Sequence, residues 1–452
     1  MAVENRDPWT GEVRAYSMMS ADAVEAKLAA AERAFPAWAA LSLEQRGALL
    51  QRVAEELHAR RDAIAATMTA EMGKLRREAL AEIEKSAGAC RYYARHAADY
   101  LREETIGTEA ARSYVRYEPI GCVLAIMPWN FPVWQVFRFL APGLMAGNVA
   151  LLKHATNVPG CADAIAGVLA AAGVPEGVFG VLHIDSEQAA AVIADPRVKA
   201  VTLTGSERAG RSVAATAGKH LKKCVLELGG SDPFIVLDDA DLARAVPVAV
   251  ASRFGNAGQT CIAAKRFIVV EAVADRFVQA FTEAATALRT GDPNDEATTL
   301  APMARADLRD ELDRQVQASV AKGARVLLGG EPGQGATAYP ATLLDNVAPG
   351  MPAWDEELFG PVASLIRVRD EAEAIRVAND TAFGLGASVW TADAARGERV
   401  AARVVAGACF VNSLVKSDVR LPFGGTKASG FGRELAGHGI HEFTNIKTVY
   451  VA

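Results

Sequence analysis

The stretch "GCVLAIMPWNFPVWQVFRFLAPGLMAGNVALLKH", Gly121 to His154, decides the class of fold. It begins and ends with a short β-rich run, and two more such runs follow it. The β-rich runs fall at 121–127, 148–154, 178–184 and 200–205, and helix-like stretches fall at 159–173 and 207–219. This strand–helix–strand alternation predicts a parallel, doubly wound α/β sheet. Ligands of such sheets bind beyond the carboxyl ends of the strands.

The sequence on either side extends this pattern. Within the first hundred residues, Asp22 with Glu25 and Ser42 with Gln45 match capping boxes that begin amphipathic helices. After a Gly- and Pro-containing junction at 227–233, a second α/β series begins. Its β-rich runs fall at 232–237, 266–270, 325–330, 386–391 and 407–412. Two α/β domains are therefore expected, which agrees with a length of 452 residues.

The composition argues against several classes of protein. A net charge of −6 disfavours a surface for nucleic acid or for an anionic membrane. The first 13 residues lack the apolar segment of a signal peptide. The six cysteines are scattered without metal-ligand spacing, so we expect reduced thiols, no metal site and a cytoplasmic protein.

Cys261 is the first candidate for chemistry. It stands in "GNAGQTCIAAK", on a polar turn built from Asn256, Gly258 and Gln259. Structural cysteines prefer apolar neighbours, so this setting favours a nucleophile, and an inert thiol is the alternative. If Thr260 and Cys261 open a helix, the helix dipole lowers the pKa of the thiol.

Two polar residues that follow or end apolar runs could serve such a nucleophile. Asn130, in "PWNFP", lies on a proline-stiffened turn where its amide could stabilise an oxyanion. The alternative is that Asn130 caps the next helix. Glu227, in "LELGG", ends an apolar run where burial raises the pKa of a carboxyl toward that of a general base. The alternative is an ion pair of Glu227 with Lys222 or Lys223.

Two further motifs suit a nucleotide. Gly205 and Ser206 lie between a β-rich run and a helix-like stretch, and the N-terminus of a helix favours phosphate. An ordinary turn is the alternative. Glu357 and Phe359, in "EELFGPV", pair an acid with an aromatic ring and could hold a ribose and a flat ring. A simple turn explains that motif equally well.

Taken in order, "PWNFP", "TGSERAG", "LELGG", "GQTC", "EELFGPV" and "PFGGTKASGFGRE" resemble the motifs of the aldehyde dehydrogenase superfamily. The resemblance covers nearly the whole chain, from "DPWTGEV" to "NIKTVYV". It implies a homodimer or homotetramer and three parts. These are a Rossmann-type dinucleotide-binding domain (1–100 and 120–229), a catalytic α/β domain (230–430) and a small β oligomerisation element (101–119 and 444–452).

The resemblance also implies a role for each site residue. Cys261 attacks the aldehyde, the Asn130 amide holds the oxyanion, and Glu227 activates the water that hydrolyses the thioester. NAD or NADP takes the hydride. Thr156 stands where the family often has an acidic residue, so either dinucleotide is expected. The positions that match dinucleotide contacts are Trp129, Asn130, Lys153, His154, Ala155, Thr156, Gly205, Ser206, Leu228, Glu357 and Phe359.

The substrate is inferred from the same resemblance. "KHATNVPGCADAI" and "FGRELAGHGIHEF" look most like the bacterial branch that oxidises succinate semialdehyde to succinate. In that branch, Arg138 and Ser417 match contacts to the distal carboxylate, and Gly255 replaces an arginine that some relatives carry. The alternatives are glutarate semialdehyde or a neutral aliphatic or aromatic aldehyde, transfer of the acyl group to coenzyme A, and a non-enzymatic scaffold. Glu227 argues against the coenzyme A branch, because a hydrolytic base would waste the thioester.

Overall fold

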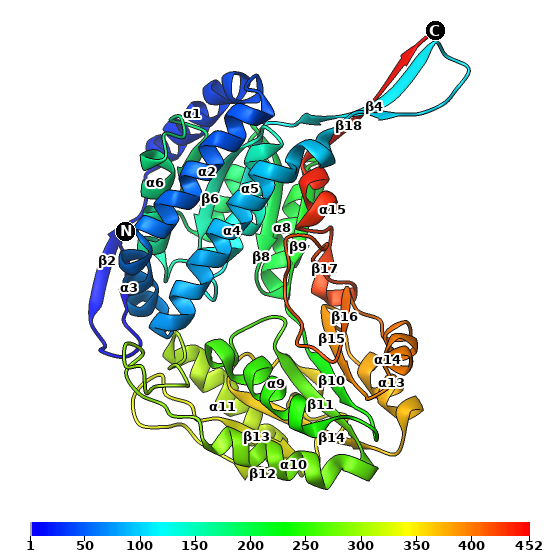
Figure 1. Cartoon of the computed structure of the whole chain (residues 1–452). Helices are drawn as coiled ribbons and strands as arrows, with labels where there is room; N and C mark the ends of the chain where they lie inside the picture. Colours follow the sequence, from blue (N-terminus) through cyan, green and yellow to red (C-terminus); the bar gives the residue numbers. More distant parts are fainter. Residues whose placement is uncertain (1) are drawn as a thin grey trace.

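The computed structural model describes residues 2–452. Figure 1 shows two α/β lobes, one above the other, and a thin arm that leaves the upper lobe and carries the C-terminus at its tip. Within the described residues, the helices are all too short or too polar to span a bilayer.

The upper lobe is built on a six-stranded sheet with the order β17-β9-β8-β5-β6-β7. Neighbouring strands are parallel except β17, which runs antiparallel to β9. The strands are β5 (Cys122–Met127), β6 (Val149–His154), β7 (Phe179–Val181), β8 (Val198–Thr204), β9 (Lys223–Glu227) and β17 (Gly430–Phe431). The helices between them are α5 (Trp134–Met145), α6 (Pro159–Ala171), α7 (Ser186–Ala194) and α8 (Glu207–Lys219). The predicted parallel sheet is confirmed. It also contains β9, which was not among the β-rich runs predicted from the sequence.

The N-terminal hundred residues add a hairpin and four helices to this lobe. Ser42 and Gln45 form the predicted capping box. The Asp22 and Glu25 box is wrong, because Ser20 is the N-cap and accepts a hydrogen bond from the amide of Ala23. The elements are β1 (Ala2–Arg6), β2 (Val13–Ser17), α1 (Ala21–Ala39), α2 (Leu43–Ala59), α3 (Arg61–Met72) and α4 (Arg76–Leu101).

The lower lobe holds a seven-stranded sheet with the order β12-β13-β14-β11-β10-β15-β16. Its pairs are parallel except β12 with β13. The strands are β10 (Asp232–Val236), β11 (Ala264–Val270), β12 (Arg325–Leu328), β13 (Thr342–Asp345), β14 (Val362–Val368), β15 (Gly386–Trp390) and β16 (Ala408–Val411). The helices are α9 (Leu242–Phe254), α10 (Glu271–Thr286), α11 (Ala306–Ala321), α12 (Pro352–Asp355), α13 (Glu371–Asn379) and α14 (Ala394–Ala401), and α15 (Ala436–Glu442) returns to the upper lobe.

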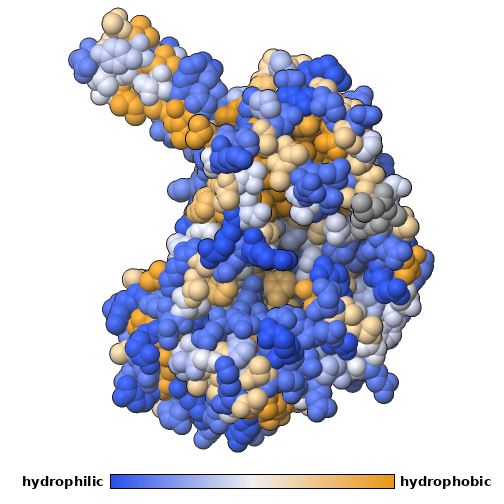
Figure 2. Space-filling view, turned by 180° about the vertical axis from the view of Figure 1, so that it is seen from behind, coloured by the Kyte–Doolittle hydropathy of each residue, from blue (hydrophilic) through white to orange (hydrophobic). Residues whose placement is uncertain are grey.

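The arm is a three-stranded antiparallel sheet with the order β18-β4-β3. It consists of β3 (Glu104–Thr105), β4 (Arg112–Pro119) and β18 (Thr444–Val451). Figure 2 shows apolar side chains along the arm, coloured orange. Ile106, Ile446, Tyr450 and Val451 are each about half exposed there, at 48–60%. These segments match the predicted β element, and its role in assembly stays a prediction.

Candidate active site

Cys261 lies on a turn whose backbone conformation is fixed by buried groups. The turn follows the short 3-10 helix η1 (Gly255–Gly258) and precedes β11. Asn256, Ala257 and Gly258 have positive φ angles of 53°, 53° and 69°. A Cβ on Gly258 would collide with the carbonyl oxygen of Gly360, so glycine is needed there. The buried Arg253 guanidinium closes the turn by donating to the carbonyls of Gly258 (2.6 Å) and Gly360 (2.9 Å).

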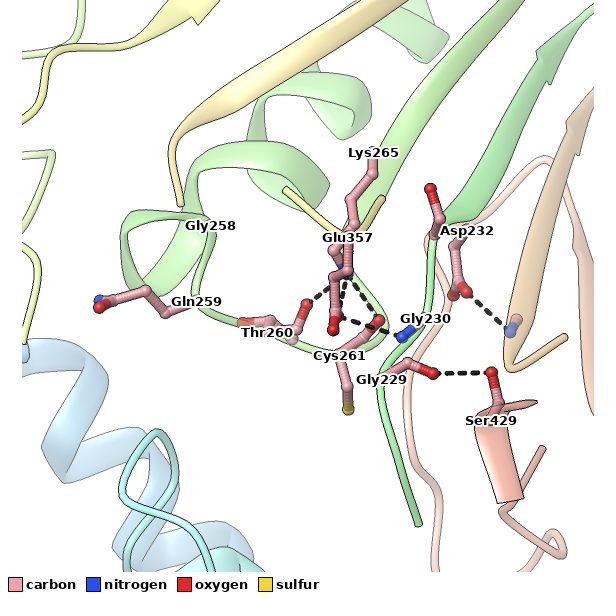
Figure 3. Close-up of polar contacts among 12 residues, drawn as sticks. Gly229, Gly230, Asp232, Gly258, Gln259, Thr260, Cys261, Lys265, Glu357 and Ser429 are labelled. Carbon is pink, nitrogen blue, oxygen red and sulfur yellow. Dashed lines mark hydrogen bonds and ion pairs between the residues drawn. The ribbon is translucent and has the colours of Figure 1, made fainter. Parts of the chain in front are cut away.

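Lys265 holds the backbone of the cysteine itself. Its buried ammonium donates to the carbonyls of Thr260 (2.9 Å) and Cys261 (2.8 Å) and forms an ion pair with Glu357 (3.2 Å). Figure 3 shows the Cys261 thiol pointing to the opposite side from Lys265. Sequence reasoning missed this role, although a lysine within the apolar run of β11, whose residues are all buried, was a usable signal.

The thiol is not at the start of a helix. The residues after it form a turn and then β11, so the condition for a helix dipole at the thiol is not met. Burial raises the pKa of Cys261 to about 11, against the opposing effect of the positive charges of Arg138 and Lys265. The resting nucleophile is therefore a neutral thiol.

Asn130 is held at both ends of the residue. The side-chain NH2 of Asn130 donates to the backbone carbonyl of Gln259 (2.9 Å). The backbone carbonyl of Asn130 accepts from the ammonium of Lys74 (2.8 Å). An amide nitrogen has two N–H groups, so one remains for a substrate oxygen. The alternative role as a helix cap is wrong, because Glu82 accepts the hydrogen bonds from the first amides of α5, those of Val133 and Trp134.

Two cavities adjoin the nucleophile turn. The cavity that we call the cysteine cavity has a volume of about 250 Å³ and includes Cys261 in its wall. The second, the lysine cavity, has a volume of about 330 Å³ and is lined by Thr260 and Ile262 on either side of Cys261. The cysteine cavity brings together most of the residues predicted from motifs, namely Trp129, Asn130, Gly205, Ser206, Leu228, Cys261, Glu357 and Phe359.

The walls of the cysteine cavity fit a dinucleotide. Ser206 is the N-cap of α8, so the free amides of that helix start at the cavity, where they suit a phosphate. Trp129 and Phe359 form an edge-to-face pair, with centroids 5.8 Å apart, which gives the cavity a flat apolar wall. Glu357 is fixed by Lys265 and by the amide of Gly230, which donates to it at 3.1 Å.

The residues at the end of β6 lie beside a separate small cavity of about 20 Å³, lined by His154, Ala155 and Thr156. His154 is buried, and burial lowers its pKa to about 4, so its ring is neutral. Its Nε2 donates to the carbonyl of Pro132 (2.8 Å) and its Nδ1 accepts from the amide of Ala155 (2.9 Å). His154 thus ties the Asn130 turn to β6, and contacts from Lys153, Ala155 and Thr156 to a dinucleotide stay predictions.

Glu227 ends β9 and is 2% exposed. Within the described residues, neither carboxylate oxygen has a hydrogen-bond partner. Burial, together with the charge of Glu434, raises its pKa well above the ordinary value. Glu227 borders neither cavity. The alternative of a lysine partner is wrong, because Lys222 donates to a backbone carbonyl and Lys223 pairs with Glu442.

Of the two residues expected to hold the substrate's carboxylate, Ser417 lines the lysine cavity and Arg138 does not. Arg138 is 2% exposed, forms an ion pair with Glu434 and donates to Thr204 (3.0 Å). It lines neither cavity, and its contact with the substrate's carboxylate stays a prediction. Ser417 does line the lysine cavity, where its hydroxyl accepts from the Lys85 ammonium (2.7 Å). Lys85 escaped sequence reasoning because no motif surrounds it.

The aldehyde dehydrogenase family model matches residues 1–449. The chain belongs to this family. It is 50% identical, over the full length of both chains, to a probable succinate-semialdehyde dehydrogenase (NADP(+)) from Synechocystis sp.. It is 49% identical to the succinate semialdehyde dehydrogenase Sad (NAD(P)+) of Escherichia coli, over 98% of this chain and 96% of that one. Among solved structures, the succinic semialdehyde dehydrogenase of Streptococcus pyogenes in complex with NADP+ aligns over both full chains with a TM-score of 0.97 and 38% identity.

Proposed function

We propose that this aldehyde dehydrogenase oxidises succinate semialdehyde to succinate with NAD or NADP. The observation that carries the proposal is that Cys261 and Asn130 line one cavity while Thr260 and Ile262, the neighbours of Cys261, line a second. One cavity suits a dinucleotide and the other offers a cation and a hydroxyl for an acidic aldehyde. The full-length similarity to enzymes named for this substrate supports the choice of aldehyde.

The side chains account for each step that the protein performs. The Cys261 thiol passes its proton to solvent, the thiolate attacks the carbonyl carbon, and the Asn130 N–H stabilises the resulting oxyanion. A dinucleotide bound in the cysteine cavity supplies the acceptor for the hydride that leaves this carbon. Water then attacks the thioester on Cys261 while Glu227 takes a proton, and succinate and the thiol are released.

Glu227 must reposition to fill this role. In the structure its carboxyl is buried without a hydrogen-bond partner and borders neither cavity. An unpaired buried carboxyl gains by moving toward water, so rotation of the side chain toward the thioester is physically reasonable. Its raised pKa makes it a stronger base once the proton has left.

The proposal is tested by measuring kcat/KM for succinate semialdehyde, glutarate semialdehyde and butanal with each dinucleotide. We expect succinate semialdehyde to exceed butanal by about tenfold or more, the value of one charge-assisted hydrogen bond. Coenzyme A should not raise the rate. Equal or higher kcat/KM for butanal or glutarate semialdehyde would overturn the proposed substrate.

The assembly and the setting are part of the same proposal. We infer a homodimer or homotetramer joined through residues 101–119 and 444–452, because β18 is an edge strand with exposed apolar side chains. We place the dinucleotide-binding domain at 1–100 and 120–229 and the catalytic domain at 230–430. Six unpaired cysteines support action in the cytoplasm.

A further inference from the structure

Lys85 is a positive charge without a carboxylate partner. It stands on α4 at the wall of the lysine cavity, with its ammonium 4.2 Å from the centroid of the Trp134 ring. One of its three N–H groups donates to the Ser417 hydroxyl. Within residues 2–452, no Asp or Glu lies within ion-pair distance of it. The ammonium can therefore accept an anion from the cavity.

The acidic residues nearest to this cavity are committed elsewhere. Glu82 forms a buried ion pair with Lys74 and caps α5. Asp418, next to Ser417, forms an ion pair with Arg420 (2.6 Å). Glu78 accepts from the amide of Asn256 (3.0 Å), and burial raises its pKa, which favours its neutral form. None of these carboxyls neutralises Lys85.

Within the part of the chain that the structure describes, the other cations expected near an acid are either paired, absent or without a partner in the cavity wall. Arg138 is already paired with Glu434. Gly255, where some relatives carry an arginine, lines the lysine cavity, and a Cβ there would meet nothing within 4 Å. Lys416 lines the cavity as well and is exposed, as Lys85 is, but among the described residues it makes no hydrogen bond to another residue of the wall. Lys85 is thus the cation of this cavity that is held in place by a hydrogen bond to another wall residue, Ser417.

Lys85 and the neighbours of Cys261 line the same cavity. The walls of the cavity run from Thr260 and Ile262, on either side of Cys261, to Ser417 and Lys85. The acid at the far end of an aldehyde bound along these walls would face Lys85 and Ser417.

We propose that Lys85 is the specificity-determining anchor for the distal carboxylate of an ω-carboxylated aldehyde, with the Ser417 hydroxyl as its second donor. The inference rests on the proposed function and names the residue that selects its substrate. The ammonium keeps two N–H groups for the carboxylate, and Ser417 donates its O–H while accepting from Lys85. An aldehyde without the carboxylate leaves these donors unpaired and binds less well.

The test compares Lys85→Met and Lys85→Arg with the parent enzyme, on succinate semialdehyde and on butanal. For Lys85→Met, the ratio of kcat/KM between the two substrates should fall about tenfold to a hundredfold, the loss of one charge-assisted hydrogen bond. Most of the fall should lie in KM. Lys85→Arg should recover part of the ratio, because the charge remains while its geometry changes.

The matched control is Lys416→Met, which removes the same charge from an exposed position on the same cavity. Its ratio should change by less than about fivefold, because Lys416 lacks the contacts with Ser417 and Trp134 that position the Lys85 ammonium, and an unpositioned surface charge contributes little. A fall equal to that of Lys85→Met would overturn the anchor in favour of general attraction by the cavity. An unchanged ratio in a folded Lys85→Met enzyme would also overturn the role of Lys85 as the anchor. The proposed function would still stand in that case, provided that the parent enzyme prefers succinate semialdehyde. A parent enzyme without that preference would instead refute the proposed function.

Discussion

At the scale of single residues, the resting state of Cys261 sets a requirement on the rest of the site. Burial raises the pKa of the thiol to about 11, so a proton must be removed before the sulfur can attack. Cys261→Ala should abolish aldehyde oxidation and leave dinucleotide binding nearly unchanged, because the other walls of the cysteine cavity remain. Turnover and the quenching of tryptophan fluorescence by NADPH check the two parts. Aldehyde oxidation by the variant would show that another residue is the nucleophile.

Lys85 gives the substrate preference a pH dependence. Burial, and secondly the charge of Arg138, lower its pKa to about 8, against the opposing charges of Glu82, Asp418 and Cys261. The ammonium is present below this pH and is lost as the pH rises through it. The ratio of kcat/KM for succinate semialdehyde to that for butanal should therefore be level near pH 6 and fall above about pH 8. Ionisations shared by both substrates cancel in the ratio. A ratio that stays level to pH 10 would contradict this assignment.

The residues differ in how well the sequence predicts them. Cys261, Asn130 and the walls of the cysteine cavity follow from short motifs, because each motif is a turn at a strand end. Arg138 and Lys85 do not, since their roles depend on partners far along the chain. Nothing near Arg138 in the sequence reveals Glu434 as its partner. Lys85 lies in a charged stretch of helix that reads as a solvated face.

At the scale of elements, the buried pair of Lys74 and Glu82 joins the N-terminal helices to the catalytic turn. Lys74 donates to the Asn130 carbonyl, and Glu82 caps α5. Glu82→Gln leaves a buried charge unpaired, which typically costs about 3–5 kcal/mol. It should lower both the free energy of unfolding in urea and kcat. Glu84→Gln, an exposed change two residues further on α4, is the control and should alter stability by less than about 1 kcal/mol. Equal effects of the two changes would refute the link.

Some strands can be predicted from their own residues, and others are defined only by pairing with distant strands. Runs such as β5 and β6 are predicted because each is apolar and bounded by turns. β13 is not predicted because its four residues are too short for a pattern, and β14 is not predicted because all but one of its residues are buried and it shows no alternation. Only pairing with neighbouring strands defines them.

At the scale of the whole molecule, the arm has no core of its own. Its outer strand, β18, exposes Ile446, Tyr450 and Val451. Ile446→Glu should reduce the molecular mass seen in sedimentation to that of a smaller assembly, because the charge would have to be buried at the subunit contact. Circular dichroism should be unchanged. A parent protein that sediments as a monomer, or a variant that keeps the parent's mass, would remove the arm from the assembly.

The proposed reaction passes through a succinyl thioester on Cys261, which Glu227 helps water to hydrolyse. Glu227→Gln keeps the shape of the side chain and removes the base, so acylation should proceed once and hydrolysis should slow. The direct measurement is the intact mass of this variant, with peptide mapping, after mixing with succinate semialdehyde and NADP. The account predicts a burst of about one NADPH per active site and one succinyl group per chain, located on Cys261. A burst without an adduct, an adduct on another cysteine, or steady turnover equal to the parent's would contradict it.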